Sequence, residues 1–469
     1  MSSSPTTGTR SAPRAKPSRK PVVTYRCGEC GWTAAKWVGR CGECQAWGSV
    51  EEVGSAATAR TTRPAVISSP ARPIAEIDIE AATAVGSGVA ELDRVLGGGL
   101  VPGAVVLLAG EPGVGKSTLL LDVASQSAQQ GRKILYISGE ESAAQIRLRA
   151  ERIGALRPRL FLAAETDLAT VLGHIENTEP DLLIVDSVQT IASGEVEGSA
   201  GGVTQVREVT SSLIRAAKDR NMSTIVVGHV TKDGSIAGPR MLEHLVDVVC
   251  QFEGDRHSRL RMVRAIKNRY GPTDEVGCFD LTEQGIVGLP DPSGLFLSQS
   301  GEPVSGTCVS VTLEGRRPLV AEVQSLVADS AGGSPRRATS GLDSNRVAMV
   351  LAVLGKRLEI PLGSKDVYVA TVGGSKVTEP AIDLAAAISL ASAYLDRPTH
   401  HRLVAFGEIG LSGELRSVPG VSRRLSEAAR IGFTHALVPS HALDQLVIPQ
   451  GMKVREVNSV QQAIDTVLR

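Results

Sequence analysis

A glycine-rich segment, GEPGVGKST at 110–118, constrains the fold of this chain more than any other feature. It follows the apolar run 105–109 and precedes three leucines, so the local order is strand, turn and helix. In that context, backbone N–H groups and the positive end of the helix dipole surround phosphate oxygens. The sequence therefore predicts a nucleoside triphosphate site, and we expect ATP. Its residues are Gly110, Glu111, Pro112, Gly113, Val114, Gly115, Lys116, Ser117 and Thr118.

Three side chains are placed to contact the phosphates and a magnesium ion. We expect Lys116 to reach the β- and γ-phosphates and the Ser117 hydroxyl to bind Mg²⁺. The apolar strand 182–185 ends in Asp186, which in this architecture orients the magnesium ion through water. The alternative for Asp186 is a cap on the following helix.

Two further strand ends carry candidate groups for ATP hydrolysis. Glu140 follows the predicted strand 133–137, and we expect it to orient the attacking water, with Glu141 as the alternative. A carboxylate at a helix start is also explained by the helix dipole alone. His229 follows another predicted strand and could sense the γ-phosphate or be a hydrogen-bonded structural histidine.

Length and composition bound the rest of the chain. Its 469 residues exceed what one hydrophobic core usually supports, so we expect two or three domains. With 42% hydrophobic residues, no apolar run of bilayer length and no secretory signal, the sequence predicts a soluble cytoplasmic protein without membrane contact. The formal net charge of zero argues against a uniformly basic nucleic-acid binder but does not exclude local basic patches.

Four of the seven cysteines form two CxxC pairs that are separated by ten residues: Cys27, Cys30, Cys41 and Cys44. This spacing predicts a tetrahedral zinc site without an open position, which is structural rather than catalytic. A segment this short cannot fold alone, and zinc coordination is worth about 10–16 kcal/mol in small finger peptides. Disulfides and redox chemistry are the alternatives, disfavoured because the chain has no export signal and no βαβ pattern here.

Composition shifts predict the order of the domains. Residues 1–21 have the composition of a disordered basic tail, 22–53 form the finger and 54–73 a linker. Over 74–290, strands alternate with helices, which predicts a mostly parallel sheet with helices on both faces. A similar alternation continues over 291–469, so we expect a third domain there.

Two loops and one basic stretch lie outside this alternation. The glycine-containing segments 191–203 and 234–242 are predicted to be mobile loops. Basic residues are densest over 256–271, which ends in the compact segment KNRYG. Within it, Lys267 and Arg269 could neutralise phosphate, either on DNA or on ATP bound to a neighbouring subunit. Part of the stretch could also be a solvated strand face.

Taken together, the CxxC pairs, the phosphate loop and the KNRYG segment resemble the RadA (Sms) family of bacterial DNA repair proteins. The resemblance runs from about residue 25 to the end, with Tyr270 in place of the usual phenylalanine. It implies a RecA-like ATPase that forms a homo-hexameric ring with ATP between neighbours, and Lys267 and Arg269 acting across the interface or coupling it to DNA. The two loops would face DNA in the central channel. The implied partners are single-stranded and branched DNA and RecA recombinase, in branch migration of recombination intermediates.

From about residue 295 the chain resembles the proteolytic domain of Lon. The position of the Lon nucleophile holds Ala381, and that of the general-base lysine holds Arg424. Alanine has no nucleophile and arginine is not deprotonated in proteins, so we expect no peptidase activity. We expect a scaffold whose surface charges either face DNA or are simply solvated. These charges are Lys356, Arg357, Arg402, Arg423 and Arg424.

The sequence as a whole predicts an α/β chain with three parts: an N-terminal four-cysteine zinc finger, a RecA-like P-loop ATPase core and a C-terminal Lon-protease-like α+β domain. The leading function is a DNA-dependent ATPase of recombinational DNA repair that uses ATP, Mg²⁺ and Zn²⁺. An ATP-dependent protease is one alternative. The other is a RecA-fold ATP switch that assembles with proteins and never translocates.

Overall fold

The computed structural model forms two compact units that divide between Ile77 and Asp78. The predicted tail and nearly all of the predicted linker lie outside the residues that the structure describes. The described residues are 24–53, 71, 73–76, 83–229, 239–254, 259–298, 303–330, 332, 334–374, 376–440 and 448–468.

The N-terminal unit contains a small antiparallel sheet around the CxxC pairs. Its strands are β1 (Thr24–Cys27), β2 (Thr33–Ala34) and β3 (Val50–Val53), in the order β2-β1-β3. The core is correspondingly small, with Cys27, Cys41 and Val50 buried and a few half-buried side chains packed on them. Such a core is too small to support a fold by itself, which agrees with a module that depends on metal.

The predicted ATPase domain is built on a nine-stranded sheet with the order β12-β11-β10-β9-β4-β8-β7-β5-β6. The six strands from β9 to β6 are parallel, as the alternating pattern predicts. The other three, β10 to β12, form an antiparallel extension that the sequence analysis did not foresee. The strands are β4 (Val105–Gly110), β5 (Ile134–Ser138), β6 (Leu160–Ala164), β7 (Leu182–Asp186), β8 (Ser223–His229), β9 (Val248–Glu253), β10 (Leu260–Asn268), β11 (Val276–Thr282) and β12 (Gly285–Gly288).

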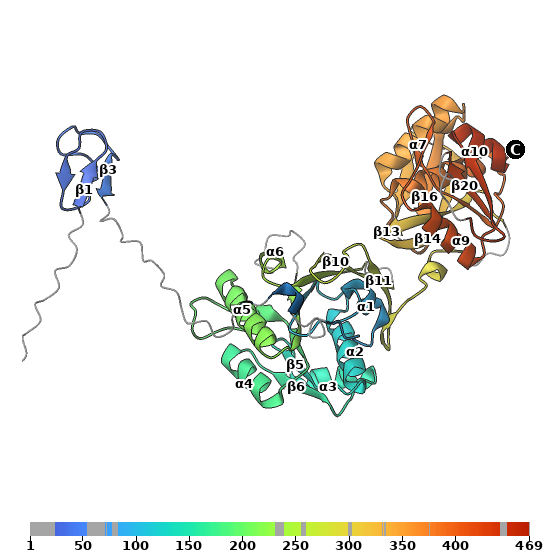
Figure 1. The fold of residues 1–469 in the computed structure, drawn as a ribbon. Helices are drawn as coiled ribbons and strands as arrows, with labels where there is room; N and C mark the ends of the chain where they lie inside the picture. The colour runs from blue at the N-terminus through green and yellow to red at the C-terminus, as the bar shows by residue number, and fades with distance from the viewer. Residues whose placement is uncertain are drawn as a thin grey trace, which may run out of the picture. The chain divides into compact units, whose positions relative to one another are not determined.

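Helices cover both faces of this sheet (Figure 1). Alternate residues of β4 point to opposite sides, so Val106 and Leu108 join one core, while Val105 and Leu107 join the other. The first core packs under α1 (Ala90–Leu96), α2 (Lys116–Gln129) and α3 (Ala143–Arg152). The second packs under α4 (Leu168–Thr178), α5 (Val203–Asp219) and α6 (Pro239–Leu242).

Side-chain caps mark the starts of two of these helices. Ser142 caps α3 in a reciprocal capping box with Gln145, and Asp167 caps α4 by accepting the Thr170 N–H. The predicted loop 191–203 has no helix or strand before α5, and the buried Gln205 side chain fastens it through Ser193 and Val196. Of the second predicted loop, 234–238 lies outside the described residues, and the rest is α6.

The C-terminal domain is built on a seven-stranded mixed sheet, in the order β15-β16-β14-β13-β17-β20-β21, with helices packed on it. Its strands are β13 (Thr307–Glu314), β14 (Arg317–Asp329), β15 (Arg337–Ser340), β16 (Lys365–Thr371), β17 (Leu403–Ala405), β20 (His435–Pro439) and β21 (Lys453–Val457). A separate hairpin pairs β18 (Glu408–Ile409) with β19 (Leu415–Arg416). The helices are α7 (Ser344–Arg357), α8 (Asp383–Leu395), α9 (Val421–Ile431) and α10 (Val460–Leu468).

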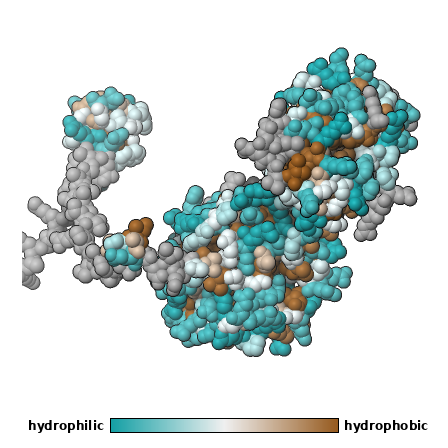
Figure 2. Space-filling view, turned by 45° about the vertical axis from the view of Figure 1, so that its right-hand side comes forward, coloured by the Kyte–Doolittle hydropathy of each residue, from teal (hydrophilic) through white to brown (hydrophobic). Residues whose placement is uncertain are grey.

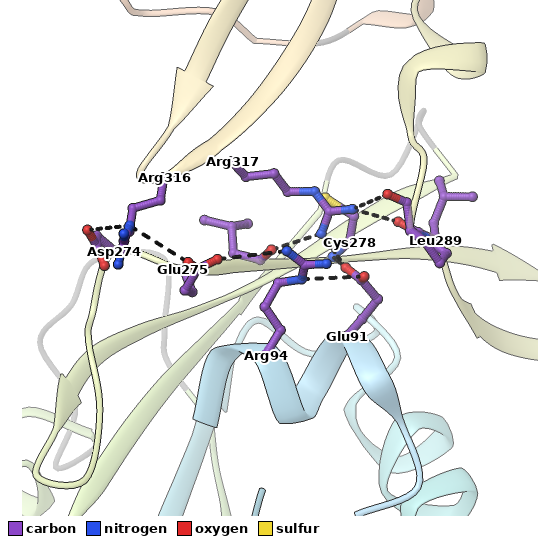
Figure 3. Close-up of polar contacts among 10 residues, drawn as sticks. Glu91, Arg94, Asp274, Glu275, Cys278, Leu289, Arg316 and Arg317 are labelled. Atoms are coloured by element: carbon purple, nitrogen blue, oxygen red, sulfur yellow. Dashed lines mark hydrogen bonds and ion pairs between the residues drawn. The ribbon is translucent and has the colours of Figure 1, made fainter. Parts of the chain in front are cut away.

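Side chains at the β13–β14 turn contact the ATPase domain (Figure 3). Arg317, at the start of β14, is 5% exposed and forms an ion pair with the buried Glu91 of α1. Its guanidinium also donates to the carbonyl oxygens of Val276 at 2.9 Å and Pro290 at 2.8 Å. A buried arginine with several fixed partners in the preceding domain makes this contact specific in geometry.

Hydrophilic and apolar residues alternate on the face of the protein that Figure 2 shows. On the face shown in Figure 2, brown apolar residues over the ATPase domain are interspersed with hydrophilic ones. Within the described part of the chain, no helix has the length and apolar character needed to cross a membrane.

Candidate functional site

The predicted nucleotide-site residues meet at one edge of the ATPase sheet. The strands β4, β8, β7 and β5 are consecutive neighbours and parallel, so their carboxyl ends lie side by side. The phosphate loop follows β4, His229 ends β8, Asp186 ends β7 and Glu140 follows β5. The carboxyl edge of a parallel sheet is where this architecture binds ligands.

The phosphate loop has the backbone that its glycines allow. Gly115 has a φ of 108°, in the left-handed region, and Lys116 begins α2 directly after it. Gly110 lies so close to the Phe252 carbonyl that a side chain there would collide with it. The Val114 carbonyl accepts a 3.1 Å hydrogen bond from Arg261 of β10, which lies two strands away from β4 in the sheet. This bond supports the loop near its middle.

Lys116 is the buried cation of the site. The residue is 4% exposed, and its ammonium donates to the carbonyl oxygens of Gly110 at 2.8 Å and Glu111 at 2.9 Å. Burial lowers the pKa of Lys116, while the negative charges of Asp186 and Glu140 act in the opposite direction. This effect agrees with the position of both carboxylates at the same sheet edge as the phosphate loop, as a phosphoryl-transfer site requires.

Glu140 is held by two neighbours. The Ser187 hydroxyl donates to Glu140 Oε1 at 2.6 Å, and His229 Nε2 lies 2.9 Å from the same oxygen. Glu141, the alternative candidate, instead pairs with Arg149 of α3 at 2.6 Å. The geometry therefore favours Glu140 over Glu141 as the residue that faces the phosphate end of the site.

Asp186 has a hydroxyl partner that sequence reasoning missed. Tyr136, in the middle of β5, donates to Asp186 Oδ2 at 2.7 Å from a buried position. Burial is the main reason why the pKa of Tyr136 lies well above its usual value, so the phenol stays a donor at neutral pH. In the sequence this tyrosine reads as one more apolar position of a strand. Its partner is recognisable only once β5 and β7 are known to be neighbours, because Asp186 ends β7.

The structure places Lys267 and Arg269 away from the phosphate loop. Lys267 pairs with Val249 near the start of β9, while the loop leaves β4 opposite Phe252, near the end of β9. At about 3.3 Å per residue the two ends are separated by roughly 10 Å of strand or more. Lys267 donates to the Glu243 and Val246 carbonyls. Within its own subunit this cation therefore lies at the opposite end of the sheet from the phosphate loop.

Arg269 is anchored rather than buried. It is half exposed and pairs with the buried Asp247 at 2.8 Å. Asp247 also accepts the Val105 N–H at 3.1 Å, so it links the KNRYG segment to the start of β4. The basic stretch is not simply a solvated strand face, since Arg261 supports the phosphate loop from a buried position.

The four cysteines of the finger form a metal site. Their ligand atoms all lie within 4.8 Å of one another, the arrangement that a tetrahedral ion requires. Sγ of Cys27 lies 3.7 Å from that of Cys44, and Sγ of Cys30 lies 3.5 Å from that of Cys41. A hydrogen bond with Ser49 is the main cause that lowers the pKa of Cys27 to about 6, whereas burial and hydrogen bonds with the other thiols raise the pKa of Cys44 to about 12.

The C-terminal domain has no peptidase site at the corresponding positions. Ala381 and Arg424 are both fully buried. The Arg424 guanidinium forms a two-pronged ion pair with Glu379 and donates to the carbonyls of Val311 at 2.6 Å and Pro419 at 3.0 Å. Arg424 is thus a packing residue, so the expectation that it contributes DNA-facing charge is wrong. Lys356, Arg357, Arg402 and Arg423 are exposed.

Comparison with protein families gives three matches along the chain. The model described as an AAA domain matches residues 71–235, and the rubredoxin metal binding domain matches residues 25–52. The third, subunit ChlI of Mg-chelatase, matches residues 343–442, within the domain that resembles Lon. The first two cover the phosphate loop with Glu140, Asp186 and His229, and the four cysteines.

Several curated proteins are similar over nearly the whole chain. One from Mycolicibacterium smegmatis is 54% identical over 94% of this chain and 96% of its own length. Another, from Mycobacterium tuberculosis H37Rv, is 55% identical over 94% of this chain and 92% of its own. A third, from Streptococcus pyogenes serotype M1, is 46% identical over 96% and 99%. All three are named DNA repair protein RadA, so the chain belongs to the RadA family of DNA repair proteins.

Proposed function

We propose that this protein is a DNA-dependent ATPase that promotes branch migration of recombination intermediates together with RecA. The observation that carries the proposal is the meeting of Lys116, Asp186 and Glu140 at one sheet edge, beside a phosphate loop. The names of the relatives supply the DNA repair context.

Each residue has a distinct role in the proposed reaction. Lys116 binds the β- and γ-phosphates, and Glu140 orients the water that attacks the γ-phosphate. His229, which contacts Glu140, reports the presence of the γ-phosphate to that carboxylate. Because Glu140 follows β5 and His229 ends β8, this one contact links the proposed water-orienting carboxylate to the end of β8.

The same residues fit a magnesium ion. The Ser117 hydroxyl follows Lys116 at the start of α2, and Asp186 offers a carboxylate at the adjoining strand end. Oxygen donors of this kind suit Mg²⁺, which neutralises developing charge on the phosphates. Ser117 would bind the ion directly, and Asp186 would hold one of its water molecules.

The position of Lys267 and Arg269 supports action beyond their own nucleotide. Both lie at the end of the sheet opposite the phosphate loop. From there they can meet the ATP of a neighbouring subunit, or a DNA backbone, in a ring of six copies. Either role uses their charge to neutralise phosphate.

The main rival, an ATP-dependent protease, has no support in the C-terminal domain. Ala381 carries no nucleophile and the Arg424 guanidinium is already paired with Glu379. The second rival, an ATP switch that never translocates, predicts no movement of DNA junctions.

A branch-migration assay tests the proposal. Synthetic three-strand junctions are incubated with the wild-type protein, ATP and Mg²⁺, with and without RecA, and strand release is measured. We expect ATP-dependent release that weakens as salt rises, because phosphate contacts release counterions. Hydrolysis without any strand release would support the switch instead.

A further inference from the structure

Resting on the proposed ATPase function, we propose that Tyr136 and Ser187 are positioning residues that control two separable properties of the reaction. Tyr136 sets the magnesium dependence through Asp186, and Ser187 sets the rate of hydrolysis through Glu140. Neither belongs to the phosphate loop.

The two hydroxyls form a reciprocal brace between neighbouring strands. Tyr136 of β5 donates to Asp186, the last residue of β7, at 2.7 Å. In return Ser187, the first residue after β7, donates at 2.6 Å to Glu140, which lies just after β5. Each strand therefore holds the carboxylate that the other strand supplies.

The backbone makes this exchange precise in register. Ser138, the last residue of β5, pairs with Asp186 of β7. Beyond it the Gly139 N–H donates to the Asp186 carbonyl at 3.1 Å, so the two backbone segments remain hydrogen-bonded where the strands end. The close contact between Gly139 and Thr190 leaves no room for a side chain at position 139. The two carboxylates are thus fixed relative to one another.

Each hydroxyl binds only one oxygen of its carboxylate. Tyr136 contacts Oδ2 of Asp186, and in the described part of the chain no hydrogen bond involves Oδ1. Ser187 and His229 both contact Oε1 of Glu140, and among the same residues none involves Oε2. One oxygen of each carboxylate is anchored, and the other has no hydrogen bond among the described residues. Without its hydrogen bond the carboxylate can rotate, so it spends less time in the orientation that the reaction needs.

Because the hydrogen bond between Tyr136 and Asp186 is buried, its loss should have a large effect. Tyr136 is 1% exposed and Asp186 7%, so water cannot readily replace a lost phenol. Ser187 is fully buried, whereas the Glu140 side chain is 40% exposed. The ring of Tyr136 remains in the core in a Tyr136→Phe variant, which removes the hydroxyl alone.

Two single-hydroxyl variants test the assignment in the full-length protein. Binding of a fluorescent non-hydrolysable ATP analogue is titrated with Mg²⁺, and ATP hydrolysis is then measured at saturating Mg²⁺. For Tyr136→Phe we expect the half-saturating Mg²⁺ concentration to rise about tenfold, with hydrolysis largely restored at high Mg²⁺. For Ser187→Ala we expect that concentration to be unchanged and the hydrolysis rate to fall about tenfold.

A matched control removes a buried hydroxyl elsewhere in the same domain. Thr210 lies fully buried in α5, and its hydroxyl donates to the Val206 carbonyl within the helix. Thr210→Val should change neither the magnesium dependence nor the hydrolysis rate. Thermal unfolding of all three variants shows whether any effect is one of stability.

The outcomes separate this inference from the proposed function. If both variants keep the wild-type magnesium dependence and rate, or if both change the two properties equally, the reciprocal brace is wrong while the ATPase stands. If the wild-type protein binds the analogue without any response to Mg²⁺ and does not hydrolyse ATP, the proposed function itself fails. A loss of folding in Tyr136→Phe alone would also refute the positioning role, because the hydroxyl would then be structural.

Discussion

The phosphate-binding site and the Lon-like site of this chain both contain a buried cation, yet only one is arranged for chemistry. Lys116 donates to two carbonyls of its own loop, while Asp186 and Glu140 act on its charge from the same sheet edge. Arg424 is locked in a two-pronged pair with Glu379 and in two further hydrogen bonds. The partners, rather than burial, distinguish a functional cation from a structural one.

This difference follows from the chemistry of the two side chains. A lysine ammonium is a compact charge on a flexible stem, so it can move from loop carbonyls to a phosphate. An arginine guanidinium presents a planar fork that matches one carboxylate, and at 0% exposure Arg424 has no route to another partner. The C-terminal site has therefore become part of the domain core.

Of the variants that test this comparison, Lys116→Ala should have the largest effect on ATP hydrolysis. In Lys116→Ala the contact with the phosphates is lost, and we expect ATP hydrolysis to fall by at least about 100-fold. Steady-state phosphate release measures it, with the exposed Lys218→Ala as a matched control in the same domain. Near-normal hydrolysis in Lys116→Ala would show that the loop is not the active site.

Removing Arg424 should affect stability instead of chemistry. Arg424→Met leaves Glu379 without its cation in a largely buried position, so we expect the unfolding free energy of the C-terminal domain to drop by about 3 kcal/mol. The exposed Arg423→Met should change it by less than about 0.5 kcal/mol. Urea unfolding measures both variants. Equal stability of the two would mean that the Arg424 pair does not hold the domain together.

The sequence predicted the groups of the ATPase site better than their supports. Glu140 and Asp186 could be identified because each follows an apolar strand, and such strand ends meet at one sheet edge. Tyr136 and Arg261 could not, since a tyrosine in an apolar strand reads as core and an arginine in a basic run reads as surface. The burial of Arg424 was missed for the same reason, because only the fold brings Glu379 beside it.

The sequence pattern also did not predict the antiparallel extension of the sheet, β10 to β12. Strand β10 lies within the basic stretch, and its register with β9 depends on pairing between distant residues. That register alone places Lys267 at the far end of the sheet. The prediction that Lys267 and Arg269 act on a neighbour or on DNA gains support from it but stays a prediction.

The Lys267→Ala variant gives a smaller and more selective effect. We expect folding and ATP hydrolysis without DNA to change less than about twofold, because among the described residues the Lys267 ammonium donates only to the Glu243 and Val246 carbonyls. Branch migration should fall about tenfold, since a phosphate contact is lost. Normal branch migration by this variant would show that Lys267 does not couple ATP hydrolysis to the movement of DNA.

Restoring the Lon residues should have no effect on peptidase activity. In Ala381→Ser with Arg424→Lys the new lysine would still pair with Glu379 and stay charged, so the serine would lack a base. Casein and fluorogenic peptide cleavage should both stay at background. Cleavage by the double variant would show that the site is poised for catalysis, and cleavage by the wild-type protein would refute its structural role.

The most direct test of the whole account is the rate of ATP hydrolysis by the wild-type protein with and without single-stranded and branched DNA. We expect DNA to accelerate hydrolysis, and Lys116→Ala to abolish the activity in every condition. A rate that is the same with and without DNA would contradict a DNA-dependent ATPase and leave only an ATP switch.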